Sequence, residues 1–211
     1  EEFVPFFEKA AQECEAVSAP VLAAQMYHES GFQRQEYRDV GADSPVGGYG
    51  QFRKDVWAQY GAEVDEQGNV TGPPGSGDPN DPGDAVMAQA RFNCQNAETI
   101  EQWKSQGKVQ GDTTELMLGA YLGGLGSVEN GLDHGVSDEN GSTPRSYMET
   151  IMEIADSYTD LEKSKNSPKN DEDDDKTALD IAKEDAEKER DKDSDKSDKD
   201  DKEKQSDDDK E

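Results

Sequence analysis

The chain has 211 residues, a formal net charge of −28 at pH 7 and only 30% hydrophobic residues. Residues 160–211 hold 23 acidic and 13 basic residues, and the part before them, with 27 acidic and 9 basic residues, is acidic in its own right. This charge argues against binding to nucleic acid, and no apolar run is long enough for membrane insertion.

The first thirty residues predict two helices joined by a tight connection. Residues 2–17 place aromatic and small apolar side chains at helical spacing, and Pro5 is tolerated in the opening turn. In the second helix Ser18 supplies an N-cap and Pro20 falls in the first turn, where its missing N–H costs nothing. Gly31 ends this helix by allowing a left-handed backbone conformation.

Glu29 falls on the apolar side of the last turn of the second helix, where an ordinary surface glutamate is not expected. A carboxyl held among Met26, Phe32 and other apolar groups loses hydration in its ionised form, which favours an acid able to donate a proton at neutral pH. The alternative is a structural role, in which Glu29 caps a neighbouring helix or pairs with Arg34 or Arg38.

Residues 46–52 and 61–82 are the two connections with chemical interest. The first contains three glycines, which allow close approach to a ligand or simply mark a turn, together with the rings of Tyr49 and Phe52. The second is rich in Asp and Asn, but it lacks the ligand spacing of an EF-hand. We expect no metal site and no cofactor, with a calcium site in this loop as the alternative.

The rest of the chain predicts further helices separated by polar or glycine-rich segments. We expect a short helix over residues 53–60, a helix beginning at Asp84, a helix capped by Thr113 or Thr114, and a final helix over residues 145–158. Convincing strand patterns of alternating polar and apolar residues are missing. The sequence therefore predicts an all-α domain over residues 1–159.

Residues 160–211 have a different composition, in which Asp, Lys, Glu and Ser dominate and aromatic residues are missing. Such a segment cannot bury enough apolar surface to offset the entropy of ordering it. We expect a long, disordered acidic tail or linker without a catalytic role.

Four short stretches follow one another in a characteristic order. They are Glu29-Ser30-Gly31-Phe32, Gly48-Tyr49-Gly50-Gln51, Ala120-Tyr121-Leu122-Gly123-Gly124 and Arg145-Ser146-Tyr147. Together they resemble the soluble lytic transglycosylases, a lysozyme-like family of enzymes that cleave peptidoglycan. The resemblance extends over about residues 4–158 and implies a goose-type lysozyme-like helical fold.

The resemblance also implies roles for individual residues. Glu29 corresponds to the catalytic acid and base. The expected substrate-binding residues are Ser30, Gly48, Tyr49, Gln51, Tyr121 and Tyr147. For Tyr121 and Tyr147 the alternative is that they are core aromatics. The chain departs from the family pattern at Leu122, where asparagine is usual, and at Tyr49-Gly50, where Leu-Met is usual.

Two cysteines, Cys14 and Cys94, could by themselves be free thiols or one disulfide. Their positions, Trp57 and the Asp-rich loop resemble secreted actinobacterial members of the family. This closer resemblance implies a Cys14–Cys94 disulfide and an extracellular, cell-wall location.

The expected activity is cleavage of the β-1,4 bond between N-acetylmuramic acid and N-acetylglucosamine, which leaves 1,6-anhydro ends. We expect peptidoglycan strands as the partner and a monomeric chain. One alternative is a muramidase-type hydrolase, which needs a second carboxylate such as Asp39 or Asp43. The other is a catalytically weak wall-binding module, favoured by Leu122. His28 is expected to be a bystander, because Phe32 stands where a zinc protease needs its second histidine.

Overall fold

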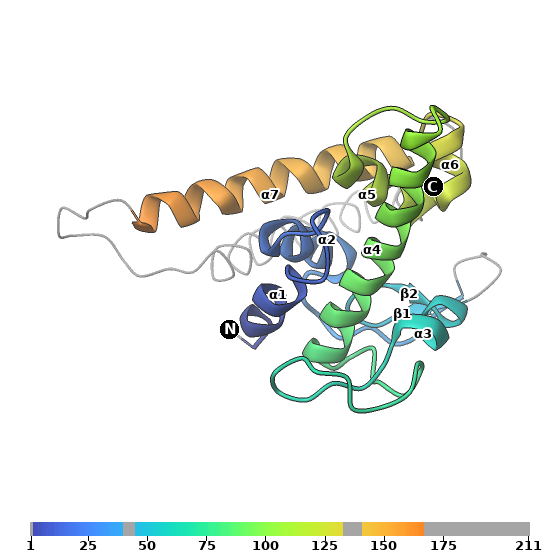
Figure 1. Ribbon diagram of the computed structural model, residues 1–211. Coiled ribbons are helices and arrows are strands. Elements are labelled where there is room, and N and C mark those ends of the chain that lie inside the picture. The colour runs from blue at the N-terminus through green and yellow to red at the C-terminus, as the bar shows by residue number, and fades with distance from the viewer. Residues whose placement is uncertain (1, 40–44, 133–140, 167–211) are drawn as a thin grey trace, which may run out of the picture. The chain divides into compact units, whose positions relative to one another are not determined.

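The computed structural model describes residues 2–39, 45–132 and 141–166, with side chains through residue 160. Over these residues the chain is mostly helical, as predicted, but a small two-stranded sheet departs from the predicted all-α class (Figure 1). The elements in order are α1 (Val4–Ala10), α2 (Ala19–Ser30), β1 (Val46–Gly47), β2 (Phe52–Arg53), α3 (Lys54–Tyr60), α4 (Pro82–Ser105), α5 (Thr113–Gly123), α6 (Leu125–Glu129) and α7 (Pro144–Asn166).

Local signals set both ends of α2. The Ser18 side chain accepts a hydrogen bond from the N–H of Val21 at 3.4 Å, and Pro20 lies in the first turn. At the other end Gly31 adopts a φ of +57°, and its N–H bonds to the carbonyl of Tyr27. A left-handed residue of this kind costs glycine little, so the sequence fixes the length of the helix.

The first helix is shorter than predicted, ending at Ala10 instead of Val17. After Ala11 the backbone bonds run three residues back, from Gln12 to Lys9 and from Glu13 to Ala10, as in tight turns. The exposed pair Gln12 and Glu13 has no apolar face to bury. The apolar spacing that continues to Val17 therefore belongs to a turned segment, and it is not part of a straight helix.

Helices α4 and α5 are both capped at the N-terminus by an aspartate. Asp81 accepts hydrogen bonds from the N–H groups of Gly83 and Asp84, so α4 starts at Pro82 instead of Asp84. In α5 the cap is Asp112, which bonds the N–H of Glu115, whereas the prediction placed the cap at one of the two following threonines. A carboxylate at this position also interacts favourably with the helix dipole.

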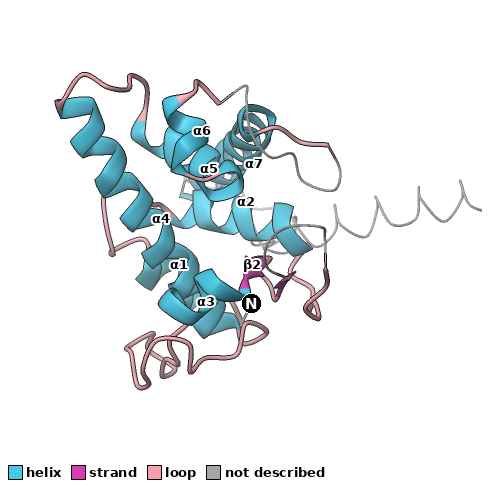
Figure 2. Ribbon diagram, turned by 90° about the vertical axis from the view of Figure 1, so that its right-hand side faces the viewer, coloured by secondary structure: helices cyan, strands magenta, loops and turns pink. Residues whose placement is uncertain are grey.

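Helix α2 lies at the centre of the packed helices, between α7 and α1 in both views (Figures 1 and 2). It also packs against α4, and α5 packs against both α4 and α7. The shared core consists of fully buried side chains from these four helices, among them Leu22, Met26, Met87, Met117, Leu118 and Ile151. Because Gln25 of α2 is also completely buried, the central helix carries a polar group into this core.

The two strands form an antiparallel hairpin in which Val46 pairs with Arg53 and Gly47 with Phe52. Its turn contains Gly48, where a Cβ atom would lie 2.5 Å from Pro79, and Gly50, where it would lie 2.5 Å from the Phe52 ring. The glycines therefore allow close approach by other segments of this protein. The sequence alone left open what these glycines accommodate.

The Asp-rich loop is held by the buried carboxylate of Asp84. Its two oxygens accept the N–H groups of Val64 at 2.7 Å and Asp78 at 2.8 Å. Burial raises the pKa of Asp84, against the opposing effect of these two bonds. In the same loop Asp65 accepts the N–H groups of Gln67 and Asn69. The acidic side chains of this region thus accept hydrogen bonds from the loop's own backbone N–H groups, as expected of Asx-type turns.

At the C-terminal end, α7 extends to Asn166, past the predicted end at residue 158 and the predicted domain boundary at residue 159. The short helix α6 was not predicted, because its glycine-rich sequence resembles a loop. The predicted disordered tail from residue 167 onward lies outside the described residues.

A disulfide joins Cys14 to Cys94, which confirms the predicted pairing. It connects the segment after α1 to the middle of α4. Within the described part of the chain, none of the helices combines the length and apolar character needed to cross a bilayer.

Candidate functional site

Glu29 lies in the last turn of α2 and is half-buried. The Tyr147 hydroxyl of α7 donates a short hydrogen bond to its Oε1 atom. Tyr147 is only 1% exposed, so the bond joins the carboxylate to the interior of the helical core. The two residues are 118 positions apart, and the packing of α2 against α7 brings them together.

The Tyr147 hydroxyl has a second partner. Gln25, one turn before Glu29 on α2, donates from Nε2 to the Tyr147 oxygen at 3.1 Å. Asn93 of α4 in turn donates from Nδ2 to Gln25 Oε1 at 2.7 Å. Gln25 and Asn93 are both completely buried. The result is a chain of side chains, Asn93–Gln25–Tyr147–Glu29, which we call the amide–tyrosine chain.

The sequence analysis missed Gln25 and Asn93. A signal was present for Gln25, which lies four residues before Glu29 and hence on the same face of the helix. Asn93 gave no local signal, because its partner is 68 residues away.

Tyr121 of α5 lies parallel to Tyr147, with ring centroids 6.4 Å apart and an angle of 4° between the ring planes. Its hydroxyl donates to the carbonyl of Gly50 at 2.7 Å. Tyr121 therefore links the glycine-rich turn to the ring that contacts Glu29. Each of the four sequence stretches that carry the family resemblance contributes a residue to this arrangement. These residues are Glu29, Gly50, Tyr121 and Tyr147.

Burial sets the ionisation of both rings. It raises the pKa of Tyr147 and Tyr121 well above the usual range, and the negative charge of Glu29 is the next cause for each. A phenolate here would lose its hydration and lie close to a carboxylate. Both hydroxyls therefore stay protonated at neutral pH and act as hydrogen-bond donors.

Tyr37 and His28 complete the surroundings of these rings. The buried hydroxyl oxygen of Tyr37 is without a hydrogen-bond partner among the described residues, and burial raises the pKa of Tyr37 to about 12. The His28 ring meets the edge of Tyr147, with centroids 5.0 Å apart. His28 therefore packs against Tyr147, and the expectation that it takes no part in the chemistry stays a prediction.

The other predicted substrate-binding residues hold local structure. The Ser30 hydroxyl donates to the Met26 carbonyl, one turn back in α2. Gln51 donates to the Gly48 carbonyl at 2.7 Å and accepts a short bond from Arg38. Gln51 also has a φ of +47°, which is unusual for a residue with a side chain and is held by these two bonds.

Tyr49 is buried in an aromatic cluster of the first helix. It is 4% exposed, and its ring meets that of Phe3 edge to face at a centroid distance of 4.9 Å. A role in binding a sugar therefore stays a prediction for this residue.

Of the two candidates for the second carboxylate that a hydrolase needs, the structure describes one. Asp39 is exposed, and Asp43 lies outside the described residues. Among the side chains described, those of residues 2–39, 45–132 and 141–160, His, Cys, Asp and Glu form no cluster of three or more that could hold a metal ion.

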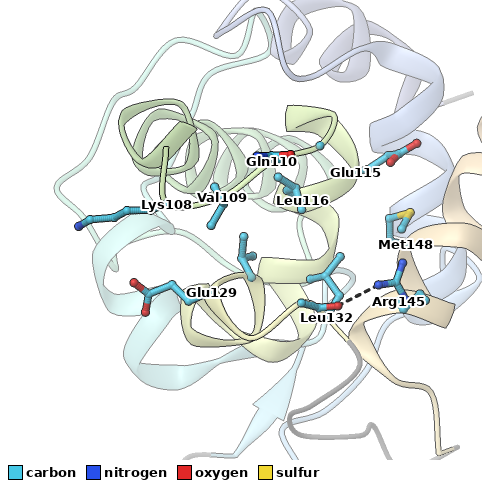
Figure 3. A pocket seen from close by; sticks show the side chains of 12 residues that line it. Lys108, Val109, Gln110, Glu115, Leu116, Glu129, Leu132, Arg145 and Met148 are labelled. Carbon is cyan, nitrogen blue, oxygen red and sulfur yellow. Dashed lines mark hydrogen bonds between the residues drawn. The ribbon is translucent and has the colours of Figure 1, made fainter. Parts of the chain in front are cut away.

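A cavity of about 370 Å³ opens among α5, α6 and α7 (Figure 3). Its lining mixes apolar side chains with charged residues of both signs. The Arg145 guanidinium on its wall donates to the Gly131 carbonyl at 2.8 Å. The lining residues are Lys108, Val109, Gln110, Gly111, Glu115, Leu116, Val128, Glu129, Gly131, Leu132, Arg145 and Met148. They include neither Glu29 nor a tyrosine, so this cavity is distinct from the surroundings of the carboxylate.

Comparison with known proteins gives no match among protein-family models, curated sequences or solved structures. The class of this protein therefore rests on its own residues and geometry.

Proposed function

We propose that the chain is a lytic transglycosylase of the lysozyme-like class, which cleaves the β-1,4 bond between N-acetylmuramic acid and N-acetylglucosamine in peptidoglycan. The observation that supports this most is the convergence of distant motifs on one carboxylate. Tyr147 bonds Glu29, Tyr121 stacks on Tyr147, and the Tyr121 hydroxyl bonds Gly50. A set of chance motif matches would not be expected to meet at one acid.

In the proposed mechanism Glu29 acts first as acid and then as base. Protonated Glu29 gives its proton to the bridging oxygen as the bond from that oxygen to the anomeric carbon breaks. The substrate's acetamide stabilises the positive charge at the anomeric carbon. The Glu29 carboxylate then takes the proton of the muramoyl 6-hydroxyl, whose oxygen bonds to the anomeric carbon. The product is a 1,6-anhydro sugar, water is not consumed, and Glu29 regains its proton.

The Tyr147 hydroxyl suits this alternation. Because burial keeps Tyr147 protonated, it can donate to Oε1 of Glu29 without competing for the transferred proton. Its hydrogen bond stabilises the carboxylate that forms after the first step. The disulfide supports a location outside the cytoplasm, where peptidoglycan lies, because oxidising compartments preserve such bonds.

The test compares the native chain with Glu29→Gln on purified peptidoglycan, with mass spectrometry of the released fragments. Glu115→Gln is the matched control, because Glu115 is also half-buried and belongs to a separate region. We expect anhydro-ended fragments from the native chain and the control. Loss of the acid and base should lower the rate by about 10²–10⁴-fold.

Two other results would replace the proposal. Reducing ends without anhydro sugars would make the protein a muramidase-type hydrolase. Equally poor release by the native chain and Glu29→Gln, with retained binding to the wall, would favour the wall-binding module that Leu122 suggested.

A further inference from the structure

The amide–tyrosine chain has a defined direction of hydrogen bonding. Asn93 donates to the Gln25 oxygen, so the Gln25 amide presents its N–H group to Tyr147. The Tyr147 oxygen accepts that N–H, and its one hydrogen points to Glu29 Oε1. A phenol has a single hydrogen to give, so its orientation follows from the partner that its oxygen accepts.

We propose that Gln25 and Asn93 are positioning residues that aim the Tyr147 hydroxyl at Glu29 and thereby set the plane of its carboxyl group. This inference rests on the proposed function for its catalytic consequence. With Oε1 held by Tyr147, the direction of the second carboxyl oxygen is fixed as well. Donation to the bridging oxygen and acceptance from the 6-hydroxyl then occur from one defined position.

Packing alone does not account for these two amides. Gln25 and Asn93 lie completely buried among apolar side chains, where amide groups are costly unless fully hydrogen-bonded. Among the described residues, Asn93 Oδ1 has no hydrogen-bond partner, so this arrangement is not the most stable filling of the core. Apolar side chains of similar size would remove that cost, and they would also remove the donor that orients Tyr147.

The first measurement is independent of activity. The hydroxyl proton of Tyr147 is identified by NMR as the resonance that disappears in Tyr147→Phe. In Gln25→Met, which removes the donor at nearly constant volume, we expect this resonance to broaden or shift. The matched control is Gln89→Met, because Gln89 is also a completely buried glutamine, on α4, and is not bonded to the amide–tyrosine chain. The control should leave the resonance unchanged.

The second measurement uses peptidoglycan cleavage in a double-mutant cycle. In the native background Gln25→Met should lower kcat by about 10-fold, the equivalent of one hydrogen bond, with KM changed less than 2-fold. In the Tyr147→Phe background the same change should lower kcat by less than 2-fold, because there is no hydroxyl left to aim. A purely structural role would give equal losses in both backgrounds.

Asn93→Leu provides a second variant if Gln25→Met does not fold, with the same direction of effect expected. A Tyr147 resonance that is unchanged in the folded Gln25 or Asn93 variant overturns the inference, and so do equal losses of kcat in the two backgrounds. The Tyr147 resonance could respond to the Gln25 substitution while the native chain releases no anhydro fragments. That result would support the positioning role and refute the proposed transglycosylase.

Discussion

Removal of the Cys14–Cys94 disulfide should cost this protein a large part of its stability. The bond closes a segment with a sequence separation of 80 residues. From loop-closure entropy, breaking a loop of this length lowers the free energy of unfolding by about 4 kcal/mol. Because small domains are stable by only about 5–15 kcal/mol, this loss is substantial. For a domain of this size it corresponds to a fall in Tm of roughly 10 °C.

The position of the bond adds a local consequence. The α1 segment has only seven helical residues, fewer than a helix needs to be stable without tertiary contacts. It is tied to α4 through Cys14, just beyond its end. We therefore expect amide hydrogen exchange in residues 4–10 to rise more than in α4 when the bond is absent.

The assay is urea unfolding of the native chain and of the double variant Cys14→Ser/Cys94→Ser. It is followed by the fluorescence of the two tryptophans, Trp57, which is 6% exposed, and Trp103. The double variant avoids leaving one unpaired thiol. Its m value should rise, because the unfolded chain without the cross-link exposes more surface. The control is the native chain under a reductant, which should match the variant. A loss below about 1 kcal/mol with an unchanged m value would refute the loop-closure reasoning.

Two further predictions concern buried ionisable groups. Asp84→Ala removes the acceptor of two loop N–H groups and should lower the free energy of unfolding by about 2–5 kcal/mol in urea. Asp65→Ala, which removes solvent-exposed hydrogen bonds to Gln67 and Asn69, should change it far less, and similar losses in both would contradict the prediction. The raised pKa values of Tyr37, Tyr121 and Tyr147 predict stability that is complete below about pH 10, where the unfolded tyrosines are protonated, and that falls as the pH rises toward about 12. Urea unfolding measures that fall, and ultraviolet titration that showed every tyrosine of the folded chain ionising near pH 10 would disprove it.

Local chemistry made much of the helical framework predictable. Ser18 and Gly31 define α2 from the sequence, because a cap and a left-handed glycine act within one turn. The same kind of signal placed the start of α4 two residues late and the cap of α5 one or two residues late, at Thr113 or Thr114 instead of Asp112. The disulfide followed from a family resemblance, and the fold bears it out.

The site was predictable only in part. Periodicity placed Glu29 on the inner side of α2, and the motif pattern singled out Tyr121 and Tyr147. The sequence could not show which group each of these hydroxyls bonds. The Tyr147 hydroxyl bonds Glu29, whereas the Tyr121 hydroxyl bonds the backbone of Gly50. Both partners depend on how helices distant in the sequence pack together, and periodicity carries no information on that.

The sequence by itself thus determined the helical class of the protein, the extent of α2 and the identity of the candidate acid, because these depend on neighbours within a few residues. The tertiary structure decided where α1 ends, what the glycines of the hairpin accommodate and which groups surround the acid. The amide–tyrosine chain shows the difference most clearly. Gln25 is separated from Asn93 by 68 residues and from Tyr147 by 122, so only the packing of three helices joins their hydrogen bonds.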